Sequence, residues 1–321
     1  MIVVSRDIVG EWFRAQASLG EDTDIHFGHV DAPGGPPVWT PVSHQRFDGV
    51  GGFVKLLRET GHTVDAMPEL KDERTPRLFR VVHAWARYLF RRRPTYRWAP
   101  LPASTVEGAP PAMATHVFDE DATRAVAASA KSLGITVNTL LLDRLTRVIR
   151  RTILGRPRSV SWMIPINMRG GVKLADEMTN HSSFLEISVV EGEAATALQQ
   201  RVRQAVADHQ HWAFWYSFQA GRYFGMVGRR LFMKASIFGR SHWVGSFSNL
   251  GVWNPVAEGA HPYAWFFCPP PVPSQPFGVG CVTYQGRLSL TLQAHSSIAA
   301  DASVAARWLR EIVEEIQRGD R

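Results

Sequence analysis

The sequence predicts an α/β protein divided into two parts. Runs rich in β-favouring residues, such as 37–42 and 159–166, alternate with longer segments in which apolar residues recur every three or four positions. Residues 99–113 are rich in Pro, Ala, Ser and Gly, a composition typical of a linker. We therefore expect a first part at residues 1–105 and a larger second part at residues 106–321.

The first part opens with a short helical pattern at residues 8–13, followed by a strand at 25–30. After a turn rich in Gly and Pro, the apolar run at 37–42 predicts a second, buried strand. Helical periodicity returns at 53–61, where a glycine ends the helix, and at 78–90, where a proline follows. In this last helix the apolar residues form one stripe: Phe79, Val82, Trp85, Ala86 and Leu89.

The second part begins with a strand and two helices, and it ends with a hairpin and a closing helix. Thr136 and Asp301 precede helical patterns and are suitable N-caps. The elements of this part are expected, in order, at residues 114–118, 121–133, 137–149, 159–166, 185–189, 193–209, 279–293 and 301–316.

The composition fits a globular protein with a substantial core. Of the 321 residues, 45% are hydrophobic and 20% are charged, and the formal net charge is +7. The positive charge favours an anionic partner: a phosphate-bearing cofactor, an acidic protein, nucleic acid or a membrane surface. The two cysteines, Cys268 and Cys281, form neither a metal pattern nor a disulfide framework. We therefore expect no metal and a cytoplasmic protein, with attachment at a membrane surface as the next candidate location.

The most informative stretch is residues 42–52, where the strand at 37–42 turns into the following helix. His44 and Asp48 lie four positions apart in this stretch, and the glycines after them permit close approach of another group. A histidine at such a strand end can act as a general base near neutral pH. The alternative is a histidine that only satisfies hydrogen bonds where the strand ends.

The spacing of His44, Asp48 and the glycine that follows resembles the signature of the CoA-dependent acyltransferase superfamily. That superfamily includes chloramphenicol acetyltransferase, the condensation domains of peptide synthetases and wax ester synthase/diacylglycerol acyltransferase-like enzymes. Four later segments are similar to it, in the expected order, so the resemblance extends from about residue 36 to the end. They are the Gly-x-Thr and helix at 134–140, the strand end at 163–169, Asn180 before a strand, and the Ser-Asn-x-Gly segment at 247–251.

The resemblance implies a two-lobed, chloramphenicol-acetyltransferase-like sandwich with mixed sheets and the active site between the lobes. It also implies acyl transfer from a CoA or carrier-protein thioester to a hydroxyl or amine acceptor. His44 would be the general base, the thioester would be a co-substrate, and no cofactor would stay bound. Two departures stand out: Ser43 replaces the first histidine of the usual pair, and only 43 residues precede His44, which predicts a shortened first lobe.

The resemblance also implies roles for other residues. Asp48 would form a structural ion pair with Arg169; the alternative is that it only caps the following helix. The Gly49 amide and the Ser248 hydroxyl would stabilise the oxyanion, and Ser248 with Asn249 beside it could instead meet the acceptor.

Two basic segments have alternative interpretations. Arg91, Arg92 and Arg93 end the helix at 78–90 and could attract a CoA or carrier-protein donor, or only complement the helix dipole. Residues 211–234 combine aromatic side chains with Arg and Lys. They could form an acyl-chain channel or a membrane-surface helix, or else ordinary core with a solvated basic face.

Two other functions compete with acyl transfer. Residues 121–150 have the layout of a helix–turn–helix, but the second helix starts with mostly apolar residues where base-reading side chains should lie, so we expect no nucleic acid. The short first lobe also fits a degenerate, non-catalytic protein that binds an acyl carrier or a partner enzyme. A second copy of the chain or a partner subunit could complete that lobe.

Overall fold

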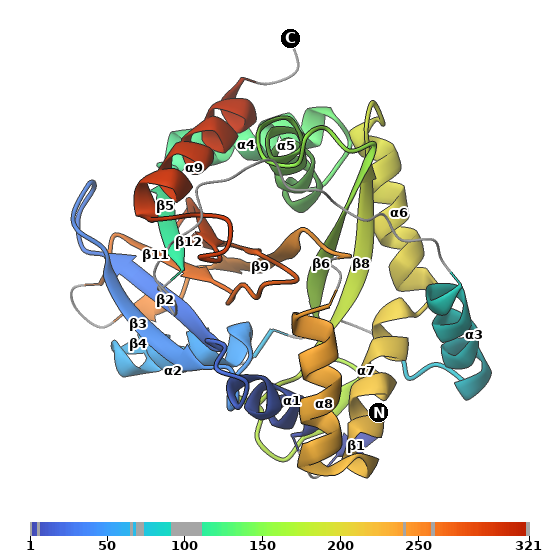
Figure 1. Cartoon of the computed structure of the whole chain (residues 1–321). Coiled ribbons are helices and arrows are strands. Elements are labelled where there is room, and N and C mark those ends of the chain that lie inside the picture. Colours follow the sequence, from blue (N-terminus) through green and yellow to red (C-terminus); the bar gives the residue numbers. More distant parts are fainter. Residues whose placement is uncertain are drawn as a thin grey trace.

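The computed structural model describes residues 2–4, 7–64, 67–68, 74–90, 111–239, 242–257 and 261–318. Its centre is a six-stranded sheet (Figure 1). In spatial order the strands are β5 (Ala112–Val117), β13 (Arg287–Ala294), β12 (Phe277–Tyr284), β9 (Gly245–Trp253), β6 (Ser159–Asn167) and β8 (Ser182–Val190). Strand β9 runs parallel to both neighbours and the other pairs are antiparallel, which confirms the predicted α/β class with a mixed sheet.

Four helices contribute to the largest hydrophobic core, which they form with this sheet. They are α4 (Glu120–Ser132), α5 (Val137–Thr152), α6 (Ala195–Ala207) and α9 (Ala302–Gln317). Trp162, Phe277 and Trp308 are fully buried in this core, and Phe277 meets Trp308 edge to face. The predicted caps are confirmed, because Thr136 accepts from the first turn of α5 and Asp301 accepts from the first turn of α9.

A smaller, three-stranded sheet carries the informative stretch. Strand β2 (Asp24–Val30) lies between β3 (Val38–Ser43) and β11 (Ala264–Cys268), antiparallel to both. Helix α2 (Gly49–Glu59) follows β3 and packs Phe53 against Phe27 of β2. A short pair, β4 (His62–Thr63) and β10 (Val256–Ala257), follows α2. Strand β11 belongs to the predicted second part of the chain, yet it pairs with a strand of the first part. The predicted boundary between residues 105 and 106 lies outside the described residues.

The third group of elements lies at the bottom of Figure 1. It contains the parallel pair β1 (Ile2–Val4) and β7 (Val172–Leu174), with α1 (Ile8–Ala17), α7 (Gln210–Ala220), the 3-10 turn η1 (Gly221–Tyr223) and α8 (Gly225–Ile237). Val9, Trp212 and Trp215 are buried together in its core. The aromatic segment predicted at 211–234 is therefore divided: α7 is largely core, whereas most of α8 is exposed.

Helix α3 (Leu78–Leu89) shows where the sequence pattern does not reveal the buried face. The predicted stripe faces outward, with Phe79, Val82 and Trp85 exposed, and the helix packs instead through Val81 and Ala84. Helix α5, which a helix–turn–helix protein would present to DNA, is largely buried from Thr139 onward. No single helix among the described residues has the length and apolar composition to cross a membrane. Helices α4 and α5 have that length and composition only when taken together, and they are bent by 95° relative to each other.

Candidate active site

His44 is the first residue after β3, in a tight turn that leads into α2. The Ser43 carbonyl accepts from the backbone N–H groups of Arg46 and Phe47, at 3.0 and 3.1 Å, and this closes the turn. Asp48 then caps α2 by accepting from the Gly51 N–H at 2.8 Å. The predicted strand, turn and helix are all present at this point, and His44 lies at the end of the strand.

The hydrogen bonds of His44 define which of its ring nitrogens carries the proton. Nδ1 lies 2.9 Å from the Phe47 carbonyl oxygen and 3.0 Å from Oδ1 of Asn180. Both partners are acceptors, so Nδ1 must be the donor. A neutral imidazole then carries its lone pair on Nε2, which is the form that a general base requires.

Asn180 is held in the orientation that this tautomer needs. Its Nδ2 donates to Oδ2 of Asp7 at 3.0 Å and to the His44 carbonyl at 3.1 Å, so its Oδ1 faces the His44 ring. Asp7 also caps α1, because its Oδ1 accepts from the Gly10 N–H at 2.7 Å. Asn180 was expected from the sequence only as a position that matches the resemblance, and Asp7 was not predicted. The signal for Asp7 was its place directly before a helical pattern.

Helix α1 covers one side of the His44 ring. Phe13 stacks on the imidazole with the ring centroids 3.7 Å apart. Close approach is possible because residue 10 is glycine: a Cβ there would lie only 2.4 Å from the carbonyl oxygen of Gln45. Burial lowers the pKa of His44 below its ordinary value of 6.5, and the charge of Asp48 offsets only part of that effect. The imidazole is therefore neutral at neutral pH.

Asp48 and Arg169 are brought together in a buried, bidentate ion pair. The two distances are 2.9 Å and 3.0 Å, and each side chain is 2% exposed. Burial alone would raise the pKa of Asp48, but the charge of Arg169 and the hydrogen bonds lower it overall. Asp48 also caps α2. The ion pair and the helix cap, which were alternatives from the sequence, are therefore both formed by this one side chain.

The ion pair fastens α2 to the segment before β8. Asp48 accepts from the His181 backbone N–H at 2.9 Å, and Arg169 donates to the carbonyl oxygens of Glu177 and Thr179. Since Asn180 precedes His181 directly, one segment holds both His44 and Asp48. Gly51 permits this packing, because a Cβ there would lie 1.9 Å from the carbonyl oxygen of Met178.

Ser248 and Asn249, which were predicted to meet the oxyanion or the acceptor, lie on opposite faces of β9. Phe247 belongs to the core under α4 and α5, whereas Leu250 belongs to the core under α2 and approaches Gly49. Because side chains alternate along a strand, Ser248 faces the α2 side and Asn249 faces the other side. Asn249 donates there to Asn138 of α5, whereas no described residue forms a hydrogen bond with the Ser248 hydroxyl.

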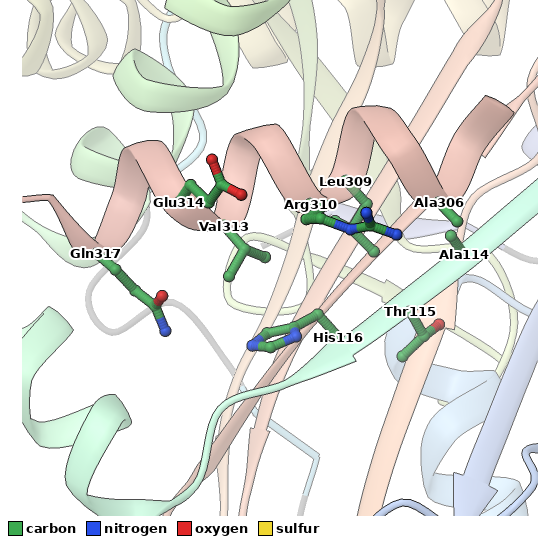
Figure 2. Close-up of a pocket in the computed structure, with 9 residues that line it drawn as sticks. All are labelled: Ala114, Thr115, His116, Ala306, Leu309, Arg310, Val313, Glu314 and Gln317. Carbon is green, nitrogen blue, oxygen red and sulfur yellow. The ribbon is translucent and has the colours of Figure 1, made fainter. Parts of the chain in front are cut away.

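Arg91, Arg92 and Arg93 lie outside the described residues, so their donor-binding role stays a prediction. Within the part of the chain that the structure describes, no group of three or more His, Cys, Asp or Glu residues could hold a metal ion. A hollow of about 330 Å³ lies between β5 and α9, around His116 and Arg310, and contains none of the His44 partners (Figure 2).

No family model matches the sequence, and no curated protein matches it. Among solved structures, a trichothecene 15-O-acetyltransferase from Fusarium sporotrichioides is similar with a TM-score of 0.61 at 10% identity, over 99% of this chain and 76% of that one. The condensation domain of the monacolin K polyketide synthase MokA has a TM-score of 0.58 at 14% identity, over 99% and 78%. The epimerization domain from the third module of tyrocidine synthetase B has a TM-score of 0.51 at 12% identity, over 88% of this chain and 69% of that one.

The chain therefore has the fold of this acetyltransferase and of these condensation and epimerization domains, which is the fold that the sequence predicted. At such low identity the likeness shows the fold alone, and any activity has to be argued from the site.

Proposed function

We propose that this protein is an acyltransferase that moves an acyl group from a CoA or carrier-protein thioester to a hydroxyl or amine. The observation that carries the proposal is the state of His44. Its Nδ1 is held as a hydrogen-bond donor by Phe47 and Asn180, and Nε2 is left with the lone pair. The fold, which the chain shares with an acetyltransferase and a condensation domain, supports this role.

In the proposed reaction, Nε2 of His44 takes the proton from the acceptor as its oxygen or nitrogen bonds to the thioester carbonyl carbon. The π electrons of the carbonyl move to its oxygen and give a tetrahedral oxyanion. The carbonyl then re-forms and the carbon–sulfur bond breaks. The departing sulfur receives the proton back from the imidazolium, so the products are an ester or amide and a free thiol.

The chain offers two groups for the oxyanion. Gly49 begins α2, where backbone N–H groups have no partner within the helix and the helix dipole favours negative charge. Ser248 faces the α2 side of β9, and its hydroxyl forms no hydrogen bond with a described residue. Asp48 and Arg169 act on this arrangement indirectly, because they hold the start of α2 and the segment that carries Asn180.

The test replaces His44 by alanine and follows thioester consumption against a panel of acyl-CoAs and acyl carrier proteins, with alcohols and amines as acceptors. We expect turnover to fall by about 10²–10⁴-fold, the contribution of a general base. The matched control is His116→Ala, which removes a half-buried histidine from the hollow beneath α9. It should keep wild-type turnover.

Circular dichroism and the thermal midpoint report whether the folded state of the variant is intact. A folded His44→Ala variant with wild-type rates would exclude His44 as the base. Absence of wild-type turnover across the whole panel, together with retained carrier binding, would instead support the non-catalytic, acyl-carrier-binding alternative.

A further inference from the structure

Helix α8 exposes an unusual amount of apolar surface. Only Arg229 and Ile237 of the helix are buried. Six large apolar residues of η1, α8 and their flanks are between 54% and 82% exposed. We define the apolar face of α8 as these side chains: Tyr223, Phe224, Val227, Leu231, Phe232 and Phe238.

The apolar face is a continuous stripe rather than a scatter of single residues. Phe224, Val227, Leu231 and Phe238 are separated by three, four and seven positions, so they lie on one side of the helix. Single exposed apolar residues are normal on protein surfaces, whereas a contiguous exposed patch marks an interaction site.

The charged residues in the segment that carries this face are all basic. Arg222, Arg230 and Lys234 are exposed on η1 and α8, and the sequence contains no Asp or Glu between Asp208 and Glu258. Neither Arg230 nor Lys234 forms an ion pair with a described residue. The partner of this face should therefore combine an apolar interior with negative charge.

The helix is firmly attached to the rest of the protein. Arg229 forms a buried ion pair with Glu11 of α1 at 2.6 Å and donates to the Gly221 carbonyl at 2.9 Å. Phe232 also meets Trp12 of α1 edge to face. Since Phe13 of α1 stacks on His44, α1 connects α8 to the candidate base.

We propose that the apolar face of α8 docks on an anionic lipid bilayer. The helix would lie in the plane of the membrane, with Val227, Leu231 and their neighbours among the upper acyl chains and the cations against lipid phosphates. A second copy of the chain fits less well. Two such faces would bring Arg230 and Lys234 of each copy together, with no acidic residue of the segment to neutralise them.

The experiment is flotation of the full chain with vesicles of phosphatidylcholine alone or mixed with phosphatidylglycerol, at low and high salt. We expect stronger binding to the mixed vesicles and weaker binding at high salt. Val227→Asp with Leu231→Asp should lower the partition coefficient at least about tenfold, because two apolar side chains no longer enter the bilayer. The matched control is Val252→Asp with Val256→Asp, at two valines that are equally exposed elsewhere and should leave binding unchanged.

A charge arm tests the same face without altering its apolar residues. Arg230→Glu with Lys234→Glu should abolish the preference for phosphatidylglycerol, whereas Arg124→Glu with Lys131→Glu on exposed positions of α4 makes the same change in net charge and should keep it. Unchanged flotation of the α8 variants would overturn the proposal. Light scattering that shows a dimer which these substitutions convert to a monomer would also overturn it. Binding of a carrier protein at this face, without binding to vesicles, would overturn it as well. Flotation involves no turnover, so its outcome is independent of the acyl-transfer proposal.

Discussion

Oδ1 of Asn180 lies 3.0 Å from Nδ1 of His44, and the amide nitrogen of the same side chain donates to Asp7 at 3.0 Å. This contact joins two residues that are far apart in the sequence, and it determines which nitrogen of the imidazole is free to accept a proton. Asn180 is thus a positioning residue, which acts on the reaction only through His44.

Asn180→Ala should lower kcat by about tenfold with little change in the KM of the acceptor. A single hydrogen bond contributes about 0.5–1.5 kcal/mol, and 1.36 kcal/mol corresponds to a factor of ten in rate. The hydrogen bond that His44 donates to Asn180 raises the pKa of His44, so its loss should also move the acid limb of the rate profile to lower pH. Asn138→Ala, which removes an asparagine from the start of α5, is the control. An unshifted profile in Asn180→Ala would leave Asn180 a purely structural role.

The pH dependence of kcat/KM should report a lowered pKa for His44. The base must be neutral, and burial holds its pKa below 6.5, so activity should persist below that pH and fall only as the pH passes through the lowered value. Initial rates across an acidic pH series, with stability checked at each point, would measure this limb. If the midpoint of this limb lay above pH 6.5, the imidazolium would be stabilised, which contradicts the lowering of the pKa by burial.

Asp48→Asn should destabilise the protein by about 3–5 kcal/mol, because it leaves the buried charge of Arg169 without its partner. The folded pKa of Asp48 is depressed, so its contribution is fully present above the unfolded value of 3.8 and is lost as pH falls through the folded value. Urea unfolding at neutral pH measures the effect. Asp121→Asn, which breaks an exposed pair with Arg124, is the control and should cost about 0–1 kcal/mol.

Gly51→Ala should be destabilising although alanine favours helices by about 1 kcal/mol over glycine. The added Cβ would lie 1.9 Å from the Met178 carbonyl oxygen, which is backbone and cannot rotate away. Helix α2 would have to move from the segment that carries Asn180, so turnover should fall together with the thermal midpoint. A variant at least as stable as wild type would show that α2 and residue 178 are not in close contact.

Local patterns in the sequence predicted much of this structure. Periodicity located most of the helices, and the strand, turn and helix around His44 followed from a short apolar run and the glycines after it. Periodicity also showed that α3 has one apolar stripe, but it could not show which neighbour covers a helix, and Trp85 of that stripe is exposed. Strands β9 and β11 were missed for a similar reason, since runs that are buried on both faces do not alternate.

The candidate site was predictable only in part. The pairing of Asp48 with Arg169 followed from a resemblance, and the geometry brings these residues together. The contacts of Asp7 and Phe13 with the site depend on how α1 folds back over the turn after β3. Such contacts leave no trace in local composition, because neither residue differs in its sequence surroundings from an ordinary cap or core residue.

The pairing of β11 with β2 also constrains how the protein can be made. Val30 is opposite Ala264 in that register, so strand β2 lacks one neighbour until most of the chain has emerged from the ribosome. Contacts this distant in sequence form slowly, and an unpaired strand edge is prone to aggregation in the meantime. The sheet that carries His44 should consequently be among the last parts to mature. Premature termination before residue 264 would leave the turn after β3 on an incomplete sheet.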